Sequence, residues 1–454
     1  MFINILTTAG LILIGVLLFA LIILFHEGGH FIAAKLSGVK VNEFALGMGP
    51  KLFSFKKGET TYTLRLLPIG GFCAMEGEDA DSDNPRAFNN AKIYKRMLIV
   101  IAGAVMNIIL GLILMMATLL PVGNFSTNEV SGFAPNAFSS NCGLQAGDKI
   151  VSVNGYKVNN SKDLVYALAK LKVSETDGTS LQIYKQDCAN ALTDICREQG
   201  MYDHMNSSDK MYDWAKSVYH DLTQSVRNVN VASDFNEADK ALSDGVNLLN
   251  KHFTKASEVP SVEVRDTRLR FRADLVVKRN GEKVNLKDVD FFTYTTADDS
   301  TPKLSVDFYS TAKEKTFLTL MEETGTQTVS VVRMVADSLI GLVKGEFSFS
   351  DVSGPIGAAS ATVQVAQEGL KTGFGDAVLN IVFVMMIITV NLGIVNMLPF
   401  PALDGGRFVF LLIEGIFRKP IPRKVEAIVN AVGLCLLLSF IFIISIKDVW
   451  MLIL

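Results

Sequence analysis

The stretch Leu21-Ile-Ile-Leu-Phe-His26-Glu27-Gly-Gly-His30-Phe-Ile-Ala-Ala34 decides the fold, because it places polar side chains in an apolar run. No charged residue occurs before Glu27, so the run is long enough to span a bilayer as a helix. Residues i and i+4 share one helix face, so His26 and His30 can bind one ion, with Glu27 beside it to take a proton from bound water. The alternative is a pair of structural histidines, but a carboxylate at membrane depth is costly unless something specific holds it.

Composition indicates an integral membrane protein with one large aqueous part. The chain has 454 residues, of which 49% are hydrophobic. Its net charge of −3 does not favour binding to nucleic acid. The first apolar run is too long, and lacks the basic start, for a cleavable signal peptide. Four segments are long enough to cross a bilayer: 5–34, 97–120, 377–397 and 427–446.

The distribution of lysine and arginine predicts the topology. The loop 35–96 carries ten of them and the loop 407–426 carries five, whereas residues 1–8 carry none. Basic short loops stay in the cytoplasm, so both termini and the long segment from about 122 to 375 are expected outside. The ends of the first and third spans should then lie at similar depth, near the cytoplasmic face.

The third span ends in a second polar motif, Asn396-Met-Leu-Pro399-Phe-Pro401-Ala-Leu-Asp404-Gly-Gly. The prolines break the helix and the glycines permit a tight turn, which can aim the Asp404 carboxylate back at the histidines. A catalytic zinc commonly takes three protein ligands and leaves a fourth position for water. Two histidines and one carboxylate complete that set.

These motifs resemble the site-2 intramembrane metalloproteases, and within them the bacterial regulator-of-sigma-E protease group, which carries a PDZ domain. The family's HExxH pattern matches His26, Glu27 and His30, and its NxxPxPxxLDG pattern matches the motif from Asn396 to Gly405. Weaker matches are Gly47-Met-Gly-Pro50, Pro68-Ile-Gly-Gly71 and Ser353-Gly-Pro-Ile-Gly357. The second span departs from the family, because no proline precedes Ala-Gly103-Ala-Val-Met-Asn107.

The resemblance implies that His26, His30 and Asp404 bind Zn²⁺ and that Glu27 is the general base. Manganese, cobalt or iron could occupy the same ligands. Asn396, followed by Pro399 and Pro401, is a candidate to hold the substrate backbone or to steady the oxyanion. A hydrogen bond between helices is the alternative role for Asn396.

The cytoplasmic loop, at 39–75, is predicted to form a β-hairpin or small sheet dipping towards the membrane. Segments 39–55 and 60–67 are rich in β-forming residues and flank Lys56-Lys-Gly-Glu59. A substrate helix must unwind before cleavage, and its freed backbone could pair with an exposed edge strand here. The residues expected to contact the substrate are Thr61, Thr63 and Leu64. A structural hairpin covering the cytoplasmic mouth is the alternative.

The outer segment is predicted to be a PDZ-like α+β domain at 122–310. The run from Cys142 to Gly155 combines a Gly-Asp turn, a β run and an Asn-Gly turn, and a helix is expected from Ser161 to Leu171. The closing hairpin is expected at 273–286 around Asn280-Gly281. Between them lies a helical insertion, about 172–267, with helices expected at 209–228 and 235–253.

The connector 311–375 and two cysteines leave alternatives open. From Thr316 to Lys344 apolar residues recur at helical intervals, which predicts an amphipathic helix lying on the outer leaflet or packing on the PDZ-like domain. Cys188 and Cys196 can form a disulfide only if no continuous helix joins them, since eight helical residues span about 12 Å. The three histidines of the insertion, His204, His220 and His252, lack ligand spacing.

The sequence therefore predicts a polytopic α-helical membrane protein whose protease core combines residues 1–121 and 376–454. We expect a zinc-dependent intramembrane endopeptidase of the bacterial cytoplasmic (inner) membrane that cleaves single-span proteins, with its active site near the cytoplasmic side. The resemblance implies anti-sigma factors and remnant signal peptides as substrates, with the PDZ-like domain as a size gate rather than a specific peptide receptor. A catalytically silent PDZ adaptor and a transporter using Glu27 and Asp404 are the alternatives.

Overall fold

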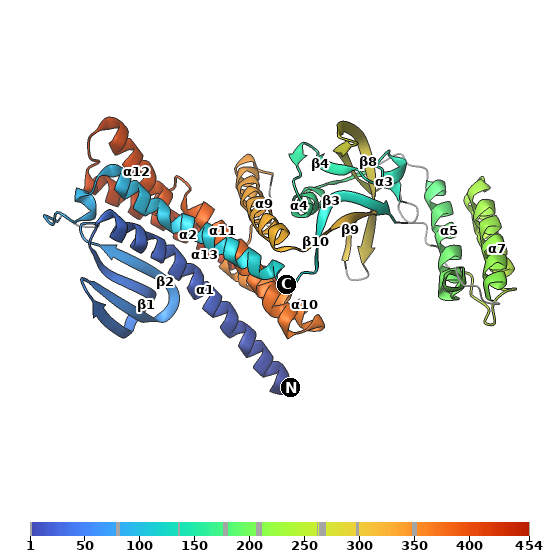
Figure 1. The fold of residues 1–454 in the computed structure, drawn as a ribbon, viewed down its shortest axis with the longest axis horizontal. Coiled ribbons are helices and arrows are strands. Elements are labelled where there is room, and N and C mark those ends of the chain that lie inside the picture. Colours follow the sequence, from blue (N-terminus) through green and yellow to red (C-terminus); the bar gives the residue numbers. More distant parts are fainter. Residues whose placement is uncertain are drawn as a thin grey trace. The chain divides into compact units, whose positions relative to one another are not determined.

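The computed structural model describes residues 2–78, 82–134, 137–175, 180–205, 211–260, 262, 269–296, 299–346 and 352–453. The chain divides into two compact units (Figure 1). Unit 1 combines residues 1–125 with 313–454, and unit 2 comprises residues 126–312. Both halves of the predicted metal site therefore belong to unit 1.

Unit 1 is a helical bundle with a small sheet (Figure 1). Its central helices pack through a core of leucine, isoleucine, valine and methionine from α1, α2 and α11. In chain order its elements are α1 (Phe2–Ser37), β1 (Val41–Lys57), β2 (Thr60–Met75), η1 (Phe88–Asn90), α2 (Ile93–Leu119), α9 (Phe317–Lys344), α10 (Pro355–Thr372), α11 (Phe374–Asn396), α12 (Asp404–Phe417) and α13 (Arg423–Ile453).

Five helices of the described chain are long and apolar enough to cross a membrane. Four of them, in α1, α2, α11 and α13, overlap the four predicted spans. The fifth is α9, which the sequence predicted to be an amphipathic connector. The finding of several long apolar helices, with β-structure beside them, agrees with a multi-pass membrane protein.

Helix α9 directs polar residues inward and many apolar residues outward. Glu323, Thr324 and Gln327 are buried, whereas Val329 is 57% exposed and Val343 is 89% exposed. The helix packs against α2 and α11. Leu320 and Val331 are buried on α9 as well, and Glu322 is exposed, so the inner face of α9 mixes polar and apolar side chains.

Strands β1 and β2 each fold back on themselves, so that two strands make a sheet four segments wide. Residues 43–46 pair on one side with 61–64 and on the other with 71–74, and 53–57 pair with 60–64. Glycines make these reversals, since Gly47, Gly49 and Gly70 have φ of +85°, +83° and +78°. The predicted hairpin is confirmed, but segment 60–64 is internal, and the edges are 53–57 and 71–75.

The N-terminus of α10 is held by the last helix. Asp448 of α13 is buried, and its Oδ2 accepts hydrogen bonds from the backbone N–H of Gly354 (2.9 Å) and of Gly357 (2.8 Å). These two glycines belong to the Ser353–Gly357 motif. A carboxylate from another helix thus satisfies amides that α10 cannot satisfy itself.

Unit 2 contains an eight-stranded sheet in the order β10-β3-β4-β7-β8-β9, with β5 on β4 and β6 on β7. The predicted hairpin is confirmed: β7 and β8 pair across Asn280-Gly281, which both have positive φ as a tight turn requires. The predicted helix is α4, although Asn160 rather than Ser161 caps it, by accepting from Asp163 N–H. The bounds are β3 (Asn124–Phe133), α3 (Phe138–Asn141), β4 (Lys149–Val153), β5 (Tyr156–Lys157), α4 (Ser161–Ala169), β6 (Val173–Glu175), β7 (Leu269–Arg279), β8 (Glu282–Thr296), β9 (Asp299–Ser305) and β10 (Phe308–Glu314).

The predicted insertion is helical and has its own apolar core. Its helices are α5 (Ser180–Glu198), α6 (Met201–His204), α7 (Met211–Val231) and α8 (Phe235–Leu249), while residues 176–179, 206–210 and 263–268 lie outside the described chain. Cys188 and Cys196 are both free and buried on the continuous helix α5. That helix keeps them about 12 Å apart, which excludes the disulfide in this fold.

Candidate metal centre

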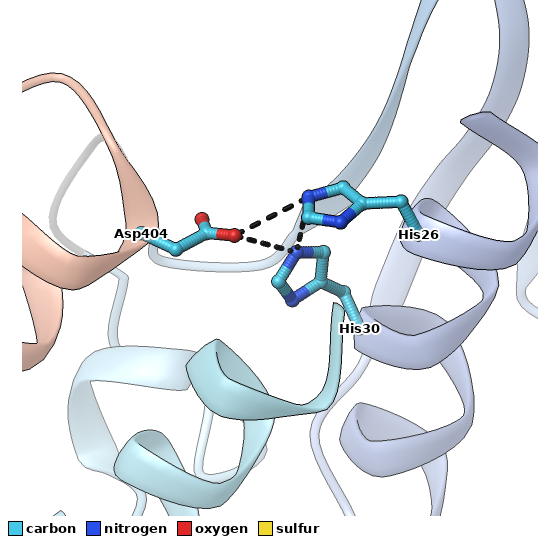
Figure 2. A group of neighbouring side chains, drawn as sticks. All are labelled: His26, His30 and Asp404. Carbon is cyan, nitrogen blue, oxygen red and sulfur yellow. Dashed lines mark hydrogen bonds and ion pairs between the residues drawn. The ribbon is translucent and has the colours of Figure 1, made fainter. Parts of the chain in front are cut away.

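Helix α1 places His26 and His30 one turn apart with their rings edge to face. The ring centroids are 4.9 Å apart and the two Nε2 atoms are 3.4 Å apart (Figure 2). The i, i+4 spacing thus places both histidines on one face of α1, as the sequence predicted. Both imidazoles direct the same nitrogen towards one point.

Asp404 reaches that point from the other end of the chain. It is the first residue of α12, directly after the turn that follows α11. Its Oδ2 lies 3.3 Å from His26 Nε2 and 3.3 Å from His30 Nε2 (Figure 2). The structure therefore brings together the three predicted ligands, His26, His30 and Asp404.

The spacing of these atoms fits a tetrahedral zinc ion. Ligand atoms at about 2.0–2.1 Å from a tetrahedral zinc lie about 3.3–3.4 Å from one another, which matches the three edges of this triangle. Asp404 Oδ2 is also buried without a satisfactory hydrogen bond in the described chain. A buried carboxylate oxygen needs a partner, and a cation at the centre of the triangle supplies one. His26, His30 and Asp404 form the only such group of potential ligands in the described residues.

The outer nitrogen of His30 fixes its tautomer. Its Nδ1 lies 2.8 Å from the carbonyl oxygen of Ile99 on α2. A carbonyl only accepts, so Nδ1 carries the hydrogen and Nε2 keeps a free lone pair directed into the triangle. Metal-binding histidines are typically held in this way.

The outer nitrogen of His26 faces a buried amide. Asn107 of α2 is fully buried, its Nδ2 lies 3.2 Å from His26 Nδ1, and its Oδ1 has no hydrogen bond among the described residues. Rotating this amide by half a turn would let Oδ1 accept the Nδ1 hydrogen that metal binding through Nε2 requires. The sequence singled out Asn107 by resemblance but gave it no role.

Glycines let α2 approach the histidines closely. A Cβ on Gly103 would overlap His30 Nε2 and lie 2.8 Å from His26 Cε1. A Cβ on Gly29 would likewise overlap the Ala102 carbonyl of α2. Gly103 and Asn107 are four residues apart, so they face the site from the same side of α2.

A cavity of about 460 Å³ opens beside the triangle. Glu27 lines it next to the ligands, so the predicted general base faces the same space. Glu78 and Arg407, which form an ion pair, line it as well. The sequence gave no signal for this pair, because its partners are 329 residues apart.

One wall of the cavity is the edge of the β-sheet. Residues 71–75 line it, and a Cβ on Gly71 would lie 3.1 Å from Glu27 Cγ. The sequence had placed the exposed edge at Thr61, Thr63 and Leu64, which is wrong. Each of these three pairs on both sides, so its backbone has no free side for a further strand.

The remaining predicted residues lie around the turn before Asp404. Asn396 is the last residue of α11, and its Nδ2 lies 3.3 Å from His26 Nε2. Pro399 and Pro401 form the turn and are absent from the cavity lining described above. Among the histidines of unit 2, His252 is paired with Asp221 at 2.8 Å.

Comparison with known proteins identifies the family of the chain. The sequence profile described as Peptidase family M50 matches residues 14–440. A protein named putative zinc metalloprotease from Clostridium perfringens is 29% identical over 441 residues, which cover 96% of this chain and 98% of that protein. The regulator of sigma-W protease RasP of Bacillus subtilis is 28% identical over 453 residues, covering 96% and 97%. The zinc metalloprotease RasP of Bacillus licheniformis is 29% identical over 464 residues, again covering 96% and 97%.

The profile spans both motifs, from within α1 to within α13, and the relatives are matched over almost their whole length. The predicted membership of the site-2 protease family is thereby confirmed. The chain belongs to Peptidase family M50.

Proposed function

We propose that the protein is a zinc-dependent intramembrane endopeptidase that cleaves single-span membrane proteins within or near the bilayer. The observation that carries the proposal is the triangle of His26 Nε2, His30 Nε2 and Asp404 Oδ2, with edges of 3.3–3.4 Å beside a cavity lined by Glu27. Zinc is favoured because two imidazoles and one carboxylate are a common catalytic zinc set, and because the relatives are named zinc metalloproteases.

Glu27 is the proposed general base. A bound zinc supplies a Lewis acid, which polarises the peptide carbonyl and makes water a nucleophile near neutral pH. Glu27 takes the proton from the attacking water and later gives it to the leaving amine. It follows His26 directly on α1, so it stays beside the ligands throughout.

Asn396 is proposed to steady the oxyanion. Its amide lies at the rim of the triangle, 3.3 Å from His26 Nε2. An N–H donor there can stabilise charge that develops on the substrate oxygen. Pro399 and Pro401 then act by shaping the turn that carries Asp404, rather than by contacting the substrate.

The unwound substrate is proposed to pair with the sheet edge 71–75. This edge is a wall of the cavity, and its outer side has no strand partner in the described residues. A substrate helix that loses its internal hydrogen bonds in the membrane needs new backbone partners, and an edge strand offers them in register.

Anti-sigma factors and remnant signal peptides are the proposed substrates. One relative is named for the regulation of sigma-W, which is the basis for the first. The PDZ-like unit 2 is proposed to admit substrates by the size of their outer domain. The active site is proposed to lie near the cytoplasmic side of the bacterial inner membrane, with unit 2 outside, because basic short loops usually stay in the cytoplasm.

The test uses purified protein reconstituted with a model single-span substrate. Glu27→Gln should abolish cleavage while zinc stays bound, whereas His26→Ala and Asp404→Ala should lose both. His252→Ala is the matched control, since this histidine also contacts a carboxylate but lies in unit 2. Wild-type protein that binds zinc yet cleaves nothing would instead support a catalytically silent PDZ adaptor.

A further inference from the structure

The turn that delivers Asp404 is held in an unfavourable backbone conformation. Ala402, two residues before Asp404, has φ of +74°, a region that non-glycine residues avoid. Hydrogen bonds within the turn run from Phe400 N–H to the Leu398 carbonyl and from Leu403 N–H to the Phe400 carbonyl. Such strain persists only where surrounding structure enforces it.

Helix α13 supplies an enforcing contact. The Oδ1 atom of Asn430 accepts a hydrogen bond from the Ala402 N–H at 3.2 Å. Three residues further along α13, Gly433 lies against Pro401, and a Cβ there would sit 2.8 Å from the Pro401 carbonyl oxygen. Residues three apart share a helix face, so Asn430 and Gly433 grip adjacent residues of the turn together.

This grip is unusual for α13, which otherwise buries little of its surface. Only 11% of its candidate span is buried, and the neighbouring Val432 and Leu434 are exposed. Gly433 is an exception, being buried against Pro401. The helix therefore makes a specific local contact with the turn rather than a continuous packed seam.

We propose that Asn430 and Gly433 are positioning residues that hold the 398–403 turn and thereby set the place of the Asp404 carboxylate. The inference deepens the proposed function and rests on it, since it assigns the last helix to the geometry of the metal site. Without the Asn430 acceptor, Ala402 relaxes to negative φ, and the start of α12 moves away from the histidines.

The experiment measures zinc affinity of the full-length protein in detergent, by competition with a chelator, together with the melting temperature. Asn430→Leu should weaken zinc binding about tenfold, as loss of groups that support metal ligands commonly does. Asn430→Asp keeps an acceptor and should stay within about threefold of wild type. Ala402→Gly in the Asn430→Leu background should restore affinity, because glycine adopts positive φ without strain.

Asn380→Leu is the matched control. Asn380 also makes one hydrogen bond between helices, from Nδ2 to the Val365 carbonyl, but lies about 24 Å along α11 from Asn396. Equal loss of zinc affinity in Asn380→Leu, or no rescue by Ala402→Gly, would overturn the positioning role. If wild type does not bind zinc, or Asp404→Asn binds it as tightly as wild type, the proposed function itself fails.

Discussion

At the residue scale, the ligands were predictable and their supports were not. His26, Glu27 and His30 lie within five consecutive residues, and helical periodicity alone places His26 and His30 on one face with Glu27 next to them. Asp404 needed the two prolines and the family resemblance, because nothing local shows where a turn will aim a carboxylate. The contact between Asn107 and His26 joins residues 81 positions apart, so no spacing rule could reveal it.

Asn107 gives the first prediction. Asn107→Leu removes the amide beside His26 Nδ1, whose Oδ1 would accept the ring hydrogen after a half-turn, and should weaken zinc binding about 10–100-fold. Asn107→Asp retains an acceptor and should bind zinc more tightly than the leucine variant. Chelator competition measures both, and equal affinities for the two variants would show that the amide does not orient the ring.

Gly103 gives a second prediction. In Gly103→Ala the new Cβ overlaps the ring of His30, so the imidazole must leave its place. We expect zinc binding to be lost while the protein still folds, as measured by metal content and by the melting temperature. Gly15→Ala on α1 is the control, since nothing lies within 4 Å of its Cβ. Full zinc occupancy in Gly103→Ala would mean that α2 can retreat from the histidines.

At the element scale, the cytoplasmic strands were predicted but their pairing was not. The β-forming residues of 39–55 and 60–67 predict two strands. The reversals at Gly47 and Gly70 add two more segments, and these move the free edge from Thr61–Leu64 to 71–75. Alternation of residue types does not show that one long strand will fold back on itself.

The edge strand can be tested with proline. Alternate residues of a strand direct their N–H to opposite sides, so either Cys73 alone or Phe72 and Ala74 together face outward. Proline at an outward position spares the pairing with β1 and should abolish cleavage while zinc remains bound. Matching substitutions at Ser54 and Phe55, on the opposite edge, are the control. If the proline variants at Phe72, Cys73 and Ala74 all still cleave the substrate, strand pairing at this edge is excluded.

Helix α9 shows a different limit of periodicity. The predicted apolar repeat does not form one face of α9: Leu320, Val332 and Val335 pack in the core of unit 1, whereas Val329 and Leu342 are exposed. The periodicity of apolar residues alone did not reveal that Glu323 and Gln327 would be buried while Val329 is exposed.

At the scale of the whole molecule, the proposed metal ligands all lie in unit 1, so the stability of unit 2 can be changed separately. Asp148 is buried in unit 2 and pairs with Arg279 at 2.7 Å. Burial acts to raise the pKa of Asp148, but hydrogen bonds from Arg279 and from the Gln145 N–H outweigh it and hold the pKa below its usual range. A lowered pKa means that the ionised pair stabilises the fold.

This pair predicts an acid-sensitive unit 2. Because the folded pKa lies below the unfolded value of about 3.9, the stabilisation is complete at neutral pH and is lost as the pH falls through the folded pKa. Asp148→Asn should cost about 2 kcal/mol at pH 7, leave zinc affinity unchanged and flatten this acid dependence. Thermal unfolding at pH 7 and pH 3 measures it, with Asp288→Asn, an exposed aspartate near Arg272, as control. A drop in zinc affinity would contradict the independence of the two units.

The Asp448 carboxylate carries a practical consequence for anyone who shortens this chain. It lies near the end of α13, yet it satisfies two amides at the start of α10. A truncation that removes Asp448 leaves Gly354 and Gly357 with unsatisfied N–H groups in an environment poor in water. Any shortened form of the protein should therefore keep α13 through Asp448.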